Sequence, residues 1–154
     1  DPAALRAEQD ALLLEVWQAC NKSGHELLLE VILPENGPDK DERHYHTMLE
    51  HFYQLGIKPD WWKLPPLSSA SWQQITALIE REDPWSRGIL ILGLDAPSDE
   101  AAAHPMIKGF AVGRTIFGQP SRRWMQGELS DEALIEEVKR NYLTLIGYWR
   151  EARR

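Results

Sequence analysis

Hydrophobic residues recur along the chain in two patterns, one typical of helices and the other of buried strands. In residues 3–19 the apolar positions Leu5, Leu12, Leu13, Val16 and Trp17 follow the three-to-four spacing of a helix with one buried stripe. Apolar spacing and capping residues predict further helices at 39–55, at 68–82 with Ser71 as its cap, at 99–103 and at 130–153. Nearly continuous apolar runs predict strands at 25–34, 59–66, 88–95 and 107–114.

The predicted order is one helix followed by four strand–helix units, which implies a parallel sheet in an α/β fold. Residues capable of chemistry stand at or near the C-terminal ends of the four strands, namely Glu30, Lys63, Gly93, and Gly113 with Arg114. Such ends converge on one axis in a (β/α)₈ barrel, but in an open doubly wound sheet they meet only at the switch point. Because a complete barrel takes about 200 residues or more, we predict that residues 1–154 form a single domain, the C-terminal half of a (β/α)₈ TIM barrel, as a piece of a longer chain.

The second predicted strand carries one lysine in an otherwise apolar run between Pro59 and Pro66. Prolines stand at strand ends, and side chains alternate along a strand, so Trp61 and Lys63 share one face. A lysine amine removed from water loses its proton more readily and then attacks carbonyl groups. We therefore interpret Lys63 as a catalytic amine. The structural alternative is that its stem packs while its ammonium reaches solvent at the strand end.

Within the first predicted strand, Glu30 is the one carboxylate inside the apolar run from Leu27 to Leu33. A carboxylate in such a strand is costly unless it is paired or used. Neighbouring strands lie about 4.8 Å apart, so Glu30 and Lys63 are expected within several ångströms of each other if both point inward. An iminium-forming lysine needs a nearby acid/base, and Glu30 is the candidate for that role. The alternative for Glu30 is a structural ion pair.

The third and fourth predicted strands end in glycine, at Gly93 and Gly113, and Arg114 follows the second of these. Backbone N–H groups beside glycines and the guanidinium of arginine are suited to phosphate, which barrels commonly bind after strands seven and eight. His44 and His51 fall near one face of a predicted helix, but no conventional ligand spacing supports a metal there. We expect neither a metal nor a cofactor.

The composition fits one soluble globular domain: 154 residues are 43% hydrophobic and 27% charged, with a net charge of −7. The acidic balance argues against nucleic acid as the main partner. Cys20 is the single cysteine, so no intrachain disulfide forms, which fits the reducing cytoplasm. No apolar run approaches the roughly 18 residues of a membrane span.

The motifs resemble a known family, the class I (Schiff-base) aldolases of the tagatose-bisphosphate aldolase type. Leu28-Leu29-Glu30-Val31 looks like that family's strand with the catalytic glutamate, Asp60-Trp61-Trp62-Lys63 its Schiff-base strand, and Gly113-Arg114-Thr115-Ile116-Phe117 its phosphate motif. Residues 109–117, with Lys63-Leu64-Pro65-Pro66 upstream, are similar to a narrower group. That group is the aldolase-like C-terminal domain fused to a ribokinase-type 5-dehydro-2-deoxygluconokinase in bacterial myo-inositol catabolism. The chain departs from the broader pattern in two places. In that family an acidic residue follows the lysine, where this chain has Leu64-Pro65-Pro66, and residues 92–95 stand where the family has a Ser-Ala-Gly motif.

The resemblance implies a carbon–carbon lyase that splits 6-phospho-5-dehydro-2-deoxygluconate into dihydroxyacetone phosphate and malonate semialdehyde. It assigns Lys63 to the Schiff base, Glu30 to acid/base catalysis, and Gly113 and Arg114 to the substrate phosphate, to which we also assign Gly93 from its place at a strand end. The implied partners are the N-terminal half of the barrel and a fused sugar kinase. Without strands one to four of the barrel, the fragment is expected to be inactive. The alternative is a non-catalytic sugar-phosphate-binding or regulatory domain of that kinase. Unpaired sheet edges also predict a homodimer.

Overall fold

The computed structural model describes residues 2–33, 41–92 and 104–154. Its helices and strands follow one another in this order: α1 (Pro2–Ser23), β1 (Leu28–Glu30), α2 (Arg43–Gln54), β2 (Trp61–Leu64), α3 (Ser69–Glu82), β3 (Gly88–Leu92), β4 (Ile107–Ala111), α5 (Arg114–Met125) and α6 (Asp131–Glu151). The four strands form one parallel sheet in the order β1-β2-β3-β4. Strands and helices alternate from α1 to β3 as the sequence predicts, and most of the segment between β3 and β4 lies outside the described residues.

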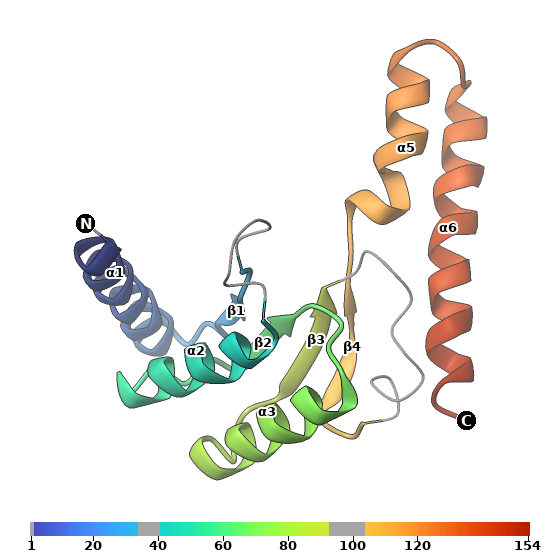
Figure 1. The fold of residues 1–154 in the computed structure, drawn as a ribbon. Coiled ribbons are helices and arrows are strands. Elements are labelled where there is room, and N and C mark those ends of the chain that lie inside the picture. Colours follow the sequence, from blue (N-terminus) through green and yellow to red (C-terminus); the bar gives the residue numbers. More distant parts are fainter. Residues whose placement is uncertain (1, 34–40, 93–103) are drawn as a thin grey trace.

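The sheet has the topology of part of a barrel. Each new strand is added on the same side of the previous one, without the reversal of strand order that marks a doubly wound sheet. Helices α2 and α3 lie together on one face of the sheet (Figure 1). Four parallel strands with helices on one face are the arrangement of one half of a (β/α)₈ barrel, so the predicted fold class is confirmed.

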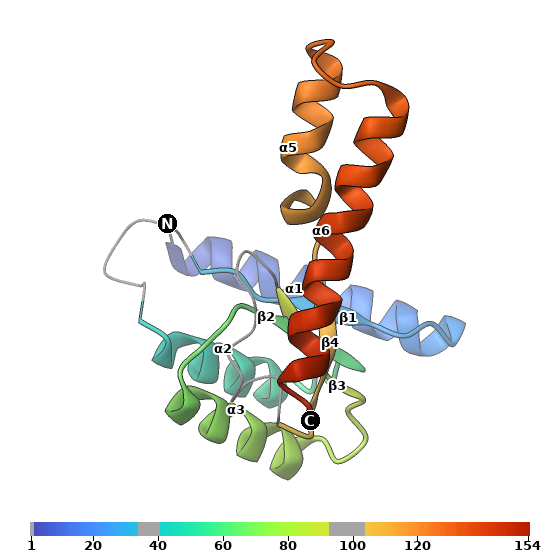
Figure 2. The same cartoon turned by 90° about the vertical axis from the view of Figure 1, so that its right-hand side faces the viewer.

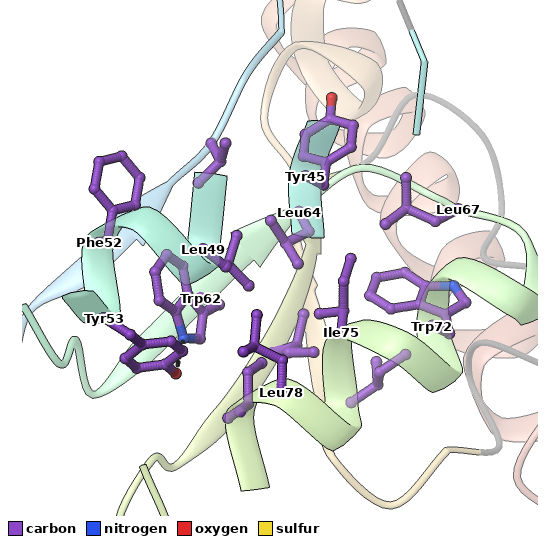
Figure 3. Close-up of a cluster of buried hydrophobic side chains, with 14 of the residues drawn as sticks. Tyr45, Leu49, Phe52, Tyr53, Trp62, Leu64, Leu67, Trp72, Ile75 and Leu78 are labelled. Atoms are coloured by element: carbon purple, nitrogen blue, oxygen red, sulfur yellow. Dashed lines mark hydrogen bonds between the residues drawn. The ribbon is translucent and has the colours of Figure 1, made fainter. Parts of the chain in front are cut away.

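The core lies between that face of the sheet and helices α2 and α3. Trp62 and Leu64 of β2 are fully buried there, and side chains of both helices point toward them (Figure 3). The Trp62 indole N–H donates to the hydroxyl of Tyr53 at 2.9 Å, and desolvation raises the pKa of the Tyr53 hydroxyl. Replacing a buried tryptophan with alanine costs about 3–5 kcal/mol. This layer fixes which face of β2 is turned to the helices.

Helix α1 forms as predicted, but its predicted buried stripe is wrong. Leu13 and Trp17 pack against the core, whereas Leu5, Leu12 and Val16 are 67%, 57% and 49% exposed. The helix is attached at one side only: the Trp17 indole donates to the carbonyl of Lys58 at 3.1 Å. The outer leucines and the valine therefore face away from the described part of the chain.

Two helix starts differ from the prediction. The helix predicted at 39–55 begins at Arg43, and residues 34–40 lie outside the described part of the structure. The cap of α3 is Ser68, whose side chain accepts from the amide of Ser71, so Ser71 is not the cap. Glu42, at the start of α2, accepts from the Ser68 amide at 3.0 Å. This bond ties the loop to α2 at Ser68, which favours Ser68 as the cap.

Helix α5 was not predicted. The fourth strand ends at Ala111, three residues before Arg114, where the helix begins. The helix runs through Gly118 and Pro120, two residues that normally argue against a helix, and it forms an antiparallel hairpin with α6 (Figures 1 and 2). The predicted short helix at 99–103 lies outside the described residues.

The hairpin is attached to the sheet through the C-terminal half of α6. The rings of Phe110 on β4 and Trp149 on α6 lie with their centroids 6.0 Å apart, edge to face. Above this contact α5 and α6 extend away from the sheet (Figure 2). Across the described residues, no helix combines the length and apolar character that crossing a membrane requires.

Candidate active site

Lys63 and Glu30 form an ion pair on the sheet face that the helices leave uncovered. The two residues are register partners on β2 and β1, and Lys63 Nζ lies 2.8 Å from Glu30 Oε1. The Lys63 side chain is 18% exposed and that of Glu30 is 34% exposed. The expected proximity of the two side chains is therefore confirmed, and their charged groups remain accessible to a ligand.

The pairing follows from the alternation of side chains along β2. Trp62 and Leu64 occupy the core, so Lys63 between them must point to the opposite face. The amide of Val31 donates to the carbonyl of Lys63 at 3.1 Å, which extends the β1–β2 ladder just past Glu30. A slip of one residue would turn Glu30 toward the helices. The ladder therefore fixes the amine and the carboxylate on the same face.

In the described part of the structure, the uncovered face is open rather than a closed pocket. Its residues in the layer of Lys63 are Glu30, Leu90 and Gly109, as the strand registers give them. Glu30 also lines a hollow of about 260 Å³ among α1, β1 and α2, which Lys63 does not line. A larger hollow of about 530 Å³ lies between α1 and α2, beside His44 and His51, away from the pair. In a complete barrel, the remaining strands would enclose the Lys63–Glu30 pair.

A second polar group lies where β1, β2 and β3 begin. The Trp61 indole N–H donates to Glu26 Oε2 at 2.8 Å, and Arg87 Nη2 lies 2.7 Å from Glu26 Oε1. The amide of Leu27 donates to Asp60 Oδ2 at 2.9 Å. These bonds join three successive strands at the ends opposite to the Lys63–Glu30 pair. The prediction from sequence missed this group, although its charged residues stand one or two positions before a strand.

Two of the three predicted phosphate residues lie in the described part of the structure. Gly113 is the N-cap of α5 and Arg114 is its exposed first residue. Gly113 makes no side-chain hydrogen bond as the N-cap of this helix start, which carries the positive end of the helix dipole. A Cβ atom at Gly113 would lie 3.2 Å from the Phe117 ring, a close contact that a small shift of the ring would have to relieve. Gly93 lies outside the described residues.

The Gly113–Arg114 pair and the ion pair both lie along the edge of the sheet at which the strands end. Helix α5 begins beyond the C-terminal end of β4, and Glu30 and Lys63 lie at or next to the C-terminal ends of β1 and β2 (Figure 1). Because strands are about 4.8 Å apart, two strand spacings of roughly 10 Å separate β2 from β4. The arrangement places an amine and a carboxylate at one end of this edge and a helix N-terminus with a guanidinium at the other.

Nearly the whole chain matches one family. The model of DUF2090, described as an uncharacterized protein conserved in bacteria, matches residues 1–153. The chain belongs to this family. No curated protein and no solved structure matches it.

A carboxylate ties the loop after Lys63 to helix α2. Glu42 Oε2 accepts from the hydroxyls of Ser68 at 2.6 Å and Ser71 at 2.8 Å. The hydrogen bond from the Ser68 side chain is the largest cause that lowers the pKa of Glu42, and desolvation by burial opposes it. The loop from Leu64 to Ser68 is thereby held at both ends.

The histidines of α2 do not form a metal centre in the described structure. His51 Nε2 lies 2.9 Å from Asp10 Oδ2, which links α2 to α1. In residues 2–33, 41–92 and 104–154, no three His, Cys, Asp or Glu side chains are grouped to hold a metal ion. The His51–Asp10 contact is an interhelical link.

Proposed function

We propose that the protein is a class I, Schiff-base aldolase-type lyase. The observation that carries the proposal is the 2.8 Å contact between Lys63 Nζ and Glu30 Oε1 on the accessible face of a parallel sheet. An amine nucleophile beside a carboxylate is what iminium chemistry requires, because protons must move on and off the attacked carbonyl. Both groups stand at the carboxyl edge of the strands, where barrel enzymes place their catalytic residues.

The proposed reaction begins when Glu30 accepts a proton from Lys63. The free amine attacks the ketone carbon, and the carbinolamine loses water to give an iminium. The iminium withdraws electrons from the adjacent carbon, so the bond one position further breaks when a base removes the hydroxyl proton. The aldehyde product leaves, the enamine that remains is protonated, and water then releases the ketone and regenerates Lys63.

The proposed substrate is a phosphorylated keto sugar acid, 6-phospho-5-dehydro-2-deoxygluconate. This part rests on the resemblance of the Lys63 strand and the Gly113–Arg114 turn to the aldolase-like domains of myo-inositol catabolism. The N-terminus of α5 and the Arg114 guanidinium suit its phosphate group. Cleavage yields dihydroxyacetone phosphate and malonate semialdehyde, and the proposed place of action is the cytoplasm. No cofactor takes part in the proposed steps.

The proposal requires that the uncovered sheet face be enclosed. Strands β1 and β4 are the two edges of the described sheet, and unpaired edges invite further strands. We propose that the N-terminal half of a barrel, in a chain that also carries a sugar kinase, supplies them. A homodimer is the alternative, and light scattering across protein concentrations separates the two, because only the dimer dissociates on dilution.

The experiment that tests the function is turnover of the keto sugar acid phosphate by the full-length protein. We expect release of dihydroxyacetone phosphate, and its loss in Lys63→Ala and in Lys63→Arg. A Lys63→Arg variant retains a positive charge beside Glu30 but forms no Schiff base. If this variant turns over substrate at the wild-type rate, the proposed mechanism is wrong.

A second candidate function is a non-catalytic sugar-phosphate-binding domain. The observation in its favour is the open face around Lys63, together with an α5 N-terminus whose N-cap is a glycine. This function needs Arg114 but neither Lys63 nor Glu30. Sugar phosphate binding that is lost in Arg114→Ala, unchanged in Lys63→Ala, and never followed by cleavage would favour it over the lyase.

A further inference from the structure

The group of Glu26, Trp61 and Arg87 lies on the ends of the strands opposite to the catalytic pair. Glu26 uses both carboxylate oxygens, one for the Trp61 indole at 2.8 Å and the other for the Arg87 guanidinium at 2.7 Å. Glu26 precedes β1, Trp61 opens β2, and Arg87 precedes β3. One side chain therefore connects three successive strands.

Strand β1 depends on such connections. It has three residues and pairs only with β2 in the described sheet. Its register places Leu28 opposite Trp61 and Glu30 opposite Lys63. Short edge strands have few ladder bonds to resist slipping, and a slip of one residue moves every side chain to the other face. The position of Glu30 is therefore sensitive to whatever holds the start of β1.

Two backbone contacts reinforce the same end of the sheet. The amide of Trp61 donates to the carbonyl of Leu27 at 3.1 Å, and the amide of Arg87 donates to the carbonyl of Asp60 at 2.8 Å. The Asp60 side chain accepts from the amide of Leu27 at 2.9 Å. With these contacts in place, Glu26 is the side chain of the β1 segment that reaches across β2 to the residue before β3.

The same bond also orients Trp61. Trp61 shares its face with Lys63 and stands two residues before it, about 7 Å along the strand. Its ring is only partly buried, so packing alone does not fix it. Donation of the indole N–H to Glu26 holds it toward the strand starts, below the layer of the amine.

We propose that Glu26 is a positioning residue for the Lys63–Glu30 pair. Through Trp61 and Arg87 it holds β1 in the register that sets Glu30 opposite Lys63, and it fixes the indole beneath the amine. Glu26 touches neither reacting group, so its effect passes through the strand. The kinetic consequence rests on the proposed aldolase function, whereas the effect on register does not.

The test compares three variants of the full chain: Glu26→Ala, Glu26→Gln and Glu128→Ala. Glu128 lies 3.6 Å from Arg123 in an ion pair next to the α5–α6 hairpin, so its variant is a matched control for losing a half-exposed, paired carboxylate. Glu26→Gln keeps an oxygen that accepts from the Trp61 indole but loses the charge opposite Arg87. The two readouts are hydrogen exchange at the Val31 amide and the rate of borohydride-trapped adduct formation at Lys63.

We expect Glu26→Ala to speed exchange at Val31 by about tenfold, because local opening of the β1 ladder becomes easier. Adduct formation should slow by on the order of ten- to a hundredfold, since small misplacements of reacting groups have effects of that size. Phosphate affinity should not change. Glu26→Gln should recover part of both losses, and Glu128→Ala should match the wild type.

Wild-type exchange at Val31 in Glu26→Ala would overturn the proposal. So would equal losses in Glu26→Ala and Glu128→Ala. If the wild type forms no adduct but Glu26→Ala still speeds exchange at Val31, the aldolase function fails while the role of Glu26 in the register stands. The two failures are therefore distinguishable.

Discussion

Glu30 and Lys63 are register partners on adjacent parallel strands, and their charged atoms lie 2.8 Å apart. The pair is held by the backbone ladder from both strands rather than by loops. Both side chains are partly exposed, so the pair contributes little to stability, in the range of about 0–1 kcal/mol. The role of the pair is therefore better tested by measuring reaction rates than by measuring unfolding.

Removing the carboxylate should separate binding from chemistry. We expect Glu30→Gln to reduce the rate of iminium formation by about 10²–10⁴, the usual contribution of a positioned acid/base. The melting temperature should change little, since the side chain is 34% exposed. Rapid-quench trapping of the adduct measures the rate. An adduct rate equal to that of the wild type would show that Glu30 moves no proton in this step.

Arg114 should matter for phosphate and not for the fold. We expect Arg114→Ala to weaken the binding of a sugar phosphate by about ten- to a hundredfold, because hydrogen bonds to charged groups contribute about 1.5–3 kcal/mol. Isothermal titration calorimetry with dihydroxyacetone phosphate measures the affinity. The control is Arg140→Ala, because Arg140 is also an exposed arginine but lies on α6. Equal affinity losses in the two variants would mean that only overall charge is involved.

Two glycines should respond to alanine in opposite directions. Gly88 has a φ of +128°, and a Cβ there would collide with the carbonyl oxygen of Met106 and lie 2.8 Å from Lys108 Cγ. We expect Gly88→Ala to destabilise the protein by about 1–3 kcal/mol. Gly147 lies inside α6 with nothing within 4 Å of its Cβ position, so Gly147→Ala should stabilise it by up to about 1 kcal/mol. Urea unfolding measures both; the same sign for both would contradict this account.

The loop after Lys63 should weaken in acid. Hydrogen bonds led by that of Ser68 lower the pKa of Glu42 below its ordinary value of 4.5. A carboxyl group with a lowered folded pKa adds stability that is present above its unfolded pKa and lost as the pH falls through the folded pKa. Thermal unfolding between pH 7 and pH 3 should therefore show a loss below about pH 4.5 that is smaller in Glu42→Gln. An identical pH dependence in the two proteins would remove Glu42 from this role.

The sheet and the Lys63–Glu30 pair were predictable because side-chain alternation is a local property. Trp62 and Leu64 flank Lys63 in the sequence, and both are apolar and turn toward the core. Lys63 must therefore lie on the opposite face of the strand, which the sequence alone predicts. The strand order then follows from repeated strand–helix units, each of which crosses in the same sense. Fold class and register of this pair therefore depend on short-range pattern.

Helix α5 and the group of Glu26, Trp61 and Arg87 were not predictable in the same way. Gly118 and Pro120 argue against a helix in the sequence, and α5 is held by α6, whose Asn141 side-chain amide donates to the carbonyl of Ile116 at 2.9 Å. Likewise Glu26 and Arg87 are 61 positions apart in sequence and meet only because β1, β2 and β3 begin side by side. The outer stripe of α1 stays exposed because burial there needs a partner that the sequence pattern does not identify.

The most direct test of the aldolase account is borohydride reduction of the full-length protein with dihydroxyacetone phosphate, followed by peptide mass spectrometry. The account predicts one stable adduct on Lys63, absent in Lys63→Ala and slower to form in Glu30→Gln. No adduct on Lys63, with sugar phosphate still bound and released by Arg114→Ala, would contradict it and favour a binding domain without catalysis.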